Sequence, residues 1–143
     1  MSTTGLEAFD STVQKTHIWL NDIMNEMGWE DQRERAYLAL RTVLHALRDR
    51  LTIEETAQLG AQLPTLIRGC YYEGWKPTGK PLKERHREEF LAHVRYAFRN
   101  DESADPERIT RGVLKILSRH VTEGEIDDIK HLLPHELREL WPQ

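Results

Sequence analysis

"RTVLHALRDRLTIEETAQLGAQLPTLIRGCY" occupies residues 41–71, and "RGVLKILSRHVTEGEIDDIKHLLPHELRELW" occupies residues 111–141. The two stretches align without a gap at a constant offset of 70, and nine of the 31 aligned positions are identical. Helical amphipathicity alone could align the leucines. It would not also align two short motifs, Thr-x-x-Glu at 52 and 122 and Leu-Pro at 63 and 133. We therefore expect the chain to be an internal duplication.

The first copy is expected to contain four helices. Apolar residues recur at helical spacing from Leu6 to Met27, and Gly28 follows as a residue that ends the helix. Asp31-x-x-Glu34 predicts the N-cap of a second helix, and Thr52-x-x-Glu55 predicts the N-cap of a third. Leu63-Pro64 should end the third helix, because a residue before proline is pushed out of the helical region, and a fourth helix should follow.

The second copy repeats this order with its own residues. Pro81 is expected to start its first helix, and Asp105-Pro106 to start the second as N-cap and first helical residue. No stretch alternates as a β-strand would. The expected fold is all-α, a single compact domain over 1–143, with about eight helices as two four-helix repeats (1–75 and 76–143). The repeats should be related by an approximate two-fold axis.

Composition restricts the compartment and the partners. The 143 residues suffice for one good core, and no apolar run approaches the ~20 residues that span a bilayer. Cys70 is the one cysteine and no secretory leader is evident, so we expect a cytoplasmic protein with no membrane partner. The net charge of −4 is uneven: residues 76–99 carry +4 between two segments of −4 each. A solvated helix face with internal ion pairs is the simplest explanation of the basic segment.

The stretch "RGCYYEGWKPTGKP" (68–81) lies where the first copy ends and the second begins. Tyr71 aligns with Trp141, so we expect it to be a core residue at the end of its repeat. The segment that follows has no counterpart in the second copy, and its glycines and prolines suit a short, stiff linker. Two interpretations stay open at this point: a structural joint, or a joint that also binds a ligand.

The run "LPTLIRGCYYEGWKP", preceded by "VLHALRDRL", resembles the bacterial family known as domain of unknown function 2267. The similarity extends over nearly the whole chain from about residue 9. It implies an all-α cytoplasmic protein made of helical repeats. The family offers no established activity, cofactor or catalytic residue, so the resemblance transfers no site residue. The second copy ends in "LRELWPQ" and lacks the full aromatic segment.

Candidate chemistry is weak by comparison. His86, Glu89 and His93 could approach one helix face, but the Glu-x-x-His pattern of a four-helix di-metal site is missing. Cys70 is expected to be a buried, inert thiol. The segment at 52–64 resembles the first helix of a helix-turn-helix, yet no basic recognition helix follows it. We expect no catalytic residue, no metal, no cofactor and no nucleic-acid partner.

The function we expect is a non-enzymatic binding or interaction module. We expect its ligand to be an acidic protein or peptide or a small anion, bound by exposed aromatic residues and a surrounding group of basic residues. The aromatic anchors are Tyr72 and Trp75, and the basic rim consists of Arg68, Lys76, Lys80, Lys83 and Arg85. A first alternative is a homo-oligomeric scaffold, for example a homodimer. Its contact would use Ile18 and Trp19, which lie outside the main apolar stripe of the first helix. A second is an enzyme or metal-binding protein with a helical site at His86, Glu89 and His93.

Overall fold

The computed structural model describes residues 3–143, and these residues form eight α-helices and no β-strand. The helices are α1 (Glu7–Met27), α2 (Arg33–Arg48), α3 (Ile53–Ala61), α4 (Thr65–Tyr72), α5 (Arg87–Ala97), α6 (Pro106–His120), α7 (Glu123–Leu132) and α8 (His135–Arg138). The expectation of an all-α chain with about eight helices is confirmed. Residues 1 and 2 of the predicted first repeat lie outside the described residues. No helix within 3–143 is long and apolar enough to cross a membrane.

The Thr-x-x-Glu motifs start helices in both halves of the chain. The Thr52 hydroxyl accepts a hydrogen bond from the Glu55 N–H at 3.1 Å, and the Thr122 hydroxyl accepts one from the Glu125 N–H at 3.3 Å. These bonds satisfy backbone donors that the first turn of a helix leaves free. Pro64 separates α3 from α4 as the sequence predicts, because the chain leaves the helix between Ala61 and Thr65.

Other helix ends test the remaining local predictions. Gly28 ends α1 with a φ of 72°, and the Asp105 carboxylate accepts from the Arg108 N–H at 3.2 Å at the start of α6, both as expected. The N-cap predicted at Asp31 is wrong. Asp31 has a φ of 55°, and α2 begins only at Arg33 with no side-chain cap. The turn from α1 to α2 holds Asp31 in the left-handed region, whereas an N-cap residue needs an extended backbone.

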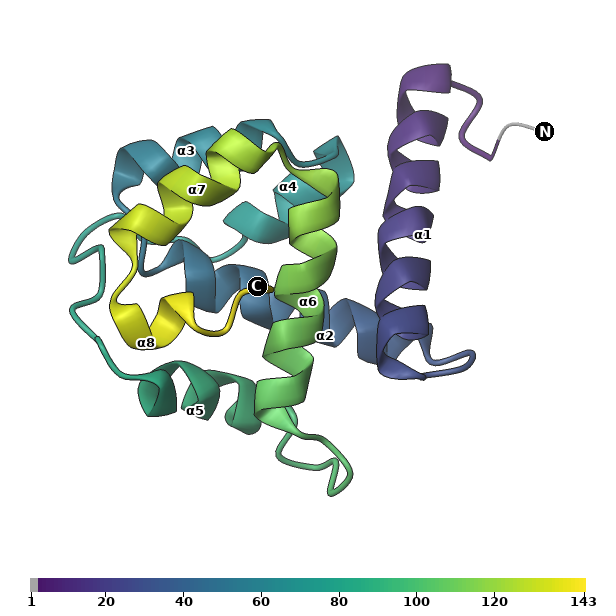
Figure 1. Ribbon diagram of the computed structural model, residues 1–143. Helices are drawn as coiled ribbons and strands as arrows, with labels where there is room; N and C mark the ends of the chain where they lie inside the picture. The colour runs from purple at the N-terminus through teal and green to yellow at the C-terminus, as the bar shows by residue number, and fades with distance from the viewer. Residues whose placement is uncertain (1–2) are drawn as a thin grey trace.

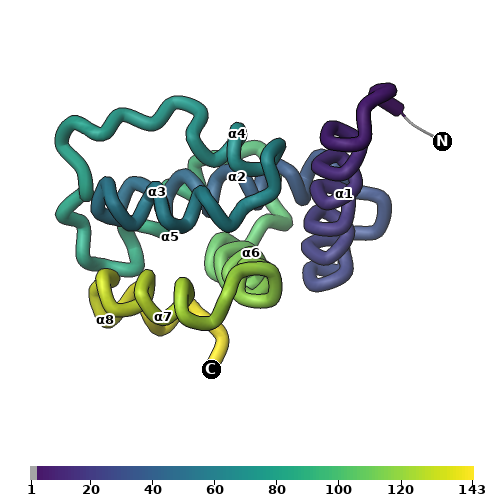
Figure 2. The backbone as a smooth tube through the Cα atoms, turned by 90° about the horizontal axis from the view of Figure 1, so that it is seen from above, coloured from purple at the N-terminus to yellow at the C-terminus, as the bar shows by residue number. Residues whose placement is uncertain are grey.

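Helices α2 and α6 lie in the middle of the molecule, and α1 lies at one edge of it in both views (Figures 1 and 2). Tyr71 and Trp141 are buried at the ends of their halves, so the prediction for Tyr71 as a core residue is confirmed. Trp19, which was expected on a contact patch, is instead 3% exposed and stacks on His120 of α6 with ring centroids 4.6 Å apart. This difference arises because α1 packs against both α2 and α6 and therefore buries two faces.

The linker, residues 73–86, crosses from α4 to α5 along the outside of the molecule (Figures 1 and 2). The helix start predicted at Pro81 is wrong, since α5 begins at Arg87. Tertiary contacts hold the chain extended here: the Leu82 N–H donates to the Asp49 carbonyl at 2.8 Å, and Arg50 pairs with Glu84 at 2.5 Å. The linker is thus fixed against the C-terminal end of α2.

Helices α3 and α7 lie side by side in both views and are in contact (Figures 1 and 2). The Gln62 side chain, after α3, connects them by donating to the Thr122 hydroxyl at 3.1 Å and accepting from the Thr122 N–H at 2.9 Å. The first four helices therefore meet the last four at this junction, in addition to the packing of α1 and α2 against α5 and α6 and the connection through the linker. The two-fold relation between the two sets and the single-domain boundaries stay predictions.

Candidate functional site

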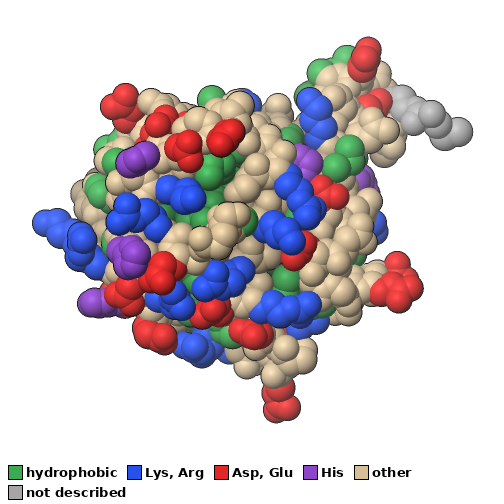
Figure 3. All heavy atoms as spheres, in the orientation of Figure 1, with side chains coloured by type: hydrophobic (Ala, Val, Ile, Leu, Met, Phe, Trp, Pro, Cys, Tyr) green, Lys and Arg blue, Asp and Glu red, His purple; other side chains and the backbone are tan. Residues whose placement is uncertain are grey.

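Four basic residues of the linker form the first candidate site, which we call the basic surface. Lys76, Lys83 and Arg85 are exposed and Lys80 is half-buried. In Figure 3, Lys and Arg side chains project from the edge of the molecule where the linker runs in Figure 1. Within residues 3–143, none of the four takes part in an ion pair or in a side-chain hydrogen bond. Their charges are therefore presented to solvent.

Arg68, predicted to complete this rim, has its donors engaged elsewhere. Its guanidinium donates to the Gly60 carbonyl at 2.7 Å and to the Leu63 carbonyl at 2.9 Å. These carbonyls lie at the C-terminal end of α3, where helix carbonyls lack helical partners and carry partial negative charge. Arg68 thus stabilises the end of α3, and the structure separates its role from that of the four linker residues.

The predicted aromatic anchors form a short stack that starts in the core. The Tyr72 ring lies 4.9 Å from the Tyr71 ring and 5.7 Å from the Trp75 ring, measured between centroids. Tyr72 and Trp75 are each half-buried, so they are less exposed than the sequence suggested. The indole N–H of Trp75 is buried and has no hydrogen-bond partner within 3–143. The stack connects the basic surface to the core through Tyr71.

Gly60 makes room for this stack. A Cβ built on Gly60 would lie within 3.0 Å of three atoms of the Tyr72 ring and hydroxyl, which is closer than real Cβ atoms approach. The aligned position in the second copy is Lys130, so this close packing belongs to the first copy alone.

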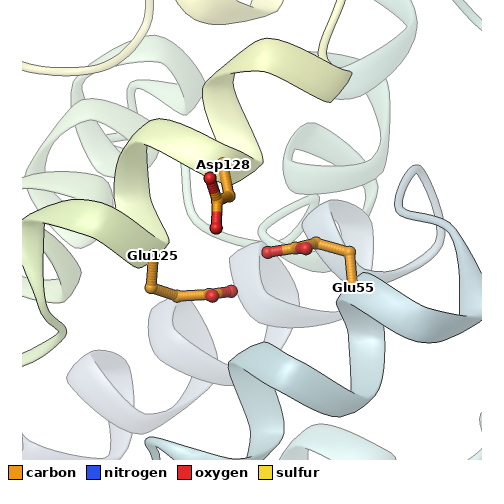
Figure 4. Close-up of side chains that lie close together, drawn as sticks. All are labelled: Glu55, Glu125 and Asp128. Carbon is orange, nitrogen blue, oxygen red and sulfur yellow. The ribbon is translucent and has the colours of Figure 1, made fainter.

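A second candidate site, not foreseen from the sequence, is the carboxylate cluster of Glu55, Glu125 and Asp128. Glu55 lies on α3, and Glu125 and Asp128 lie one turn apart on α7 (Figure 4). One carboxylate oxygen from each of the three lies within 4.8 Å of the other two. Glu55 and Glu125 are each 6% exposed, whereas Asp128 is exposed.

Glu55 and Glu125 occupy aligned positions of the two similar stretches of sequence. Each is the third residue after its threonine cap, and the sequence predicts that it reaches back to that cap. In the structure the threonine hydroxyls accept the backbone N–H groups, while the two carboxylates turn toward each other (Figure 4). Glu55 and Glu125 are identical residues at the offset of 70, and this was the signal available in the sequence. To predict the cluster from this identity, one would also have to know that α3 and α7 face each other.

The environment of the pair favours a retained proton. Burial, followed by a side-chain hydrogen bond and charge repulsion from Glu55, raises the pKa of Glu125 to about 8. Asp128 adds further repulsion in the same direction. No Lys or Arg of residues 3–143 forms an ion pair with Glu55 or Glu125. Two like charges this close in a poorly solvated site cannot both ionise easily, so the pair holds one proton near neutral pH.

The helical His/Glu site is not assembled. His86 pairs with Glu136 of α8 at 2.6 Å, and His93 lies 3.5 Å from Glu84 of the linker. The Glu136 carboxylate raises the pKa of His86 through a hydrogen bond. Among residues 3–143, the group of acidic, histidine or cysteine side chains that could hold a metal ion is the carboxylate cluster.

Comparison with known families agrees with the motif-based resemblance. The model of a family described as "Uncharacterized conserved protein (DUF2267)" matches residues 16–140. The chain belongs to this family. A comparison with curated proteins finds no match. The description of this family names no activity, so any function must be inferred from the two candidate sites.

Proposed function

We propose that the protein is a non-enzymatic binding module that takes an acidic peptide on the basic surface of its linker. The observation that carries the proposal is the charge balance of the linker. Its two carboxylates, Glu73 and Glu84, each pair with an arginine at 2.5 Å, while the four basic side chains remain without a partner in the described chain. The linker therefore presents unbalanced positive charge although the whole chain is acidic.

Rigid support strengthens the proposal. Arg48 is 4% exposed and donates to the carbonyls of Tyr71 at 2.7 Å and Glu73 at 3.0 Å, so the start of the linker is fixed to α2. Arg50 fixes its later part through Glu84. A surface ordered before binding loses less conformational entropy when a ligand arrives. Tyr72 and Trp75 lie beside it and offer apolar contact next to the charges.

The test is fluorescence anisotropy with a labelled hexaglutamate peptide at low salt. Binding is expected to weaken with added salt, since exposed charges are screened. The charge-reversal variant K76E/K83E should weaken binding at least about tenfold, that is, by roughly 1.4 kcal/mol or more. The matched control K15E/R95E makes the same change in net charge at exposed positions of α1 and α5. Equal weakening in both variants would mean that overall charge, and not this surface, attracts the peptide.

Tripolyphosphate supplies the small-anion arm of the same experiment. If it displaces the peptide from the wild type and its own affinity falls in K76E/K83E, the surface accepts small anions as well. If it binds where the peptide does not, the ligand class is a small anion instead of a peptide.

A second candidate function is a homodimer formed through α1. Leu6 and Phe9 are 52% and 58% exposed, and they begin the apolar stripe that Leu20 and Ile23 continue into the core. Ile18, predicted for such a contact, is 48% exposed. A second copy offers the same unfinished stripe, so an isologous pair would complete both. Light scattering at several concentrations tests this: Phe9→Glu should shift a dimer to the monomer, and a strict monomer in the wild type removes the candidate.

A further inference from the structure

We propose that Glu55, Glu125 and Asp128 bind one divalent cation of the calcium type, which links α3 to α7. This site is separate from the basic surface, and it stands or falls independently of peptide binding there.

The spacing of the carboxylates fits a single ion. Calcium binds oxygen ligands at about 2.3–2.6 Å, so oxygens on opposite sides of one ion are roughly 4.6–5.2 Å apart. One oxygen from each of the three side chains lies within 4.8 Å of the other two. One ion placed between them could therefore contact all three. Figure 4 shows the Glu55 and Glu125 carboxylates directed at each other across the interface, with Asp128 directed at the same space.

Unsatisfied buried atoms are the second observation that points to a ligand. Glu55 Oε1 and Glu125 Oε2 are inaccessible to solvent, and no other side chain or backbone N–H of residues 3–143 donates a hydrogen bond to them; both residues are 94% buried. Buried polar atoms in folded proteins nearly always have a partner. These carboxylate oxygens are directed into a shared space and need a positive partner, which either a shared proton or a cation can supply.

The surrounding groups do not supply the missing partner. The Tyr71 hydroxyl is buried nearby, but it donates its proton to the Thr56 carbonyl at 2.9 Å. Gln62 is engaged with Thr122 at the other end of the junction. A proton shared between Glu55 and Glu125 bridges one pair of oxygens and leaves the Asp128 charge uncompensated. A divalent cation replaces that proton and interacts with all three carboxylates.

The donor set selects the class of cation. All three ligands are carboxylates, which suit hard cations such as Ca²⁺, Mn²⁺ and Mg²⁺, while Zn²⁺ and Cu²⁺ favour nitrogen and sulfur ligands. Mg²⁺ demands near-octahedral geometry with oxygens at about 2.0–2.1 Å and gives up its water reluctantly, whereas Ca²⁺ accepts irregular sets of carboxylates. Asp128 is exposed, so the ion has a route in from solvent and can keep water ligands on that side.

Binding would strengthen the contact between α3 and α7, in addition to the packing of α1 and α2 against α5 and α6. Gln62 already connects the C-terminal end of α3 to the start of α7. The ion would hold Glu55, in the first turn of α3, to α7, so both ends of this junction would be fixed.

The experiment is thermal unfolding of chelator-treated protein at pH 8, with 10 mM CaCl₂ against NaCl of equal ionic strength. Partly exposed calcium sites typically have Kd values of about 10⁻⁴ to 10⁻³ M, so we expect Tm to rise by roughly 5 °C with Ca²⁺ and less with Mg²⁺. Terbium luminescence, with Tb³⁺ as a stand-in for Ca²⁺, gives a readout that does not depend on unfolding.

Two variants one residue apart provide the matched comparison. Asp128→Asn removes a ligand and should reduce the Ca²⁺-dependent Tm rise and the Tb³⁺ signal several-fold, whereas Asp127→Asn, also exposed on α7, should change neither. Glu125→Gln should abolish both while the protein still folds, since the amide can donate to Glu55. A wild-type Tm that responds equally to Ca²⁺ and to NaCl would overturn the proposal, as would equal loss in Asp127→Asn and Asp128→Asn.

Discussion

The junction between α3 and α7 and the linker between α4 and α5 both connect the first four helices to the last four, but they use opposite chemistry. The α3/α7 junction is acidic, buried, and made from the same residue of each copy, Glu55 and Glu125. The linker is basic, largely exposed, and made from residues that occur once. The paired glutamates of the junction stand at aligned positions of the two similar stretches, whereas the linker residues have no counterpart in the alignment. The two should therefore respond differently to mutation, pH and salt.

The largest effect is expected where the linker is attached. Arg50 is 4% exposed, donates to the Ala46 carbonyl at 2.8 Å, pairs with Glu84 and lies over the Phe90 ring at 5.0 Å. Arg50→Ala removes a buried partner together with the packing of its stem, and should lower the free energy of unfolding by about 3 kcal/mol. Urea unfolding measures this.

Arg41→Ala is the control for that prediction. Arg41 pairs with the other linker carboxylate, Glu73, but its side chain is 35% exposed, so its loss should cost less than about 1 kcal/mol. Similar losses from Arg41→Ala and Arg50→Ala would show that burial does not distinguish the two attachments.

The acidic junction should make stability fall as pH rises. The folded state raises the pKa of Glu125 from its ordinary 4.5 to about 8, so it holds a proton that the unfolded chain releases. This contribution is complete below about pH 4.5, is lost progressively between pH 4.5 and 8, and changes no further above that. The slope should reach on the order of 1 kcal/mol per pH unit. Urea unfolding from pH 5 to 8 measures it, and Glu125→Gln should flatten the profile.

The aromatic stack gives an intermediate effect. Gly60→Ala forces the Tyr72 ring out of its position, and should cost about 1–2 kcal/mol and alter the fluorescence of the neighbouring Trp75. Gly69→Ala is the matched control, because nothing lies within 4 Å of its added Cβ in α4. That substitution should stabilise by about 0.5–1 kcal/mol through helix propensity. A stabilising Gly60→Ala would show that the ring moves freely and that the stack is not rigid.

The smallest expected effect compares the two threonine caps. Thr52→Ala and Thr122→Ala should each cost about 1 kcal/mol as N-cap losses. Thr122→Ala should cost roughly 0.5 kcal/mol more, because its hydroxyl also accepts from Gln62 across the junction. In a Gln62→Ala background the two caps should become equal. If the costs of Thr52→Ala and Thr122→Ala still differ in the Gln62→Ala background, the difference does not come from the contact between Gln62 and Thr122.

Local signals in the sequence predicted much of the fold. The caps at Thr52 and Thr122 and the break before Pro64 depend on neighbouring residues, so they could be recognised without knowing the tertiary structure. The start of α5 could not, because contacts from Asp49 and Arg50 keep the preceding residues extended. Trp19 was misplaced for a similar reason, since its burial depends on α6, which lies far away in the sequence.

The candidate sites were predictable to different degrees. The basic surface follows from a run of charges in one segment and was named from composition alone. The engagement of Arg68 with the carbonyls of Gly60 and Leu63 depends on how α4 packs against α3, which the charge pattern does not contain. The meeting of Glu55 and Glu125 likewise depends on the contact between α3 and α7. The basic surface could therefore be predicted from residue types alone, whereas the carboxylate cluster and the contacts of Arg68 depend on how the helices pack.

Titration of the Glu55 and Glu125 carboxyl carbons by NMR tests most directly whether the two halves meet through carboxylates that share a proton. We expect the Glu125 carboxyl to keep its proton well above pH 6 and to titrate near pH 8, because burial and the neighbouring Glu55 raise its pKa. A Glu125 titration near its ordinary value of 4.5 would contradict this account.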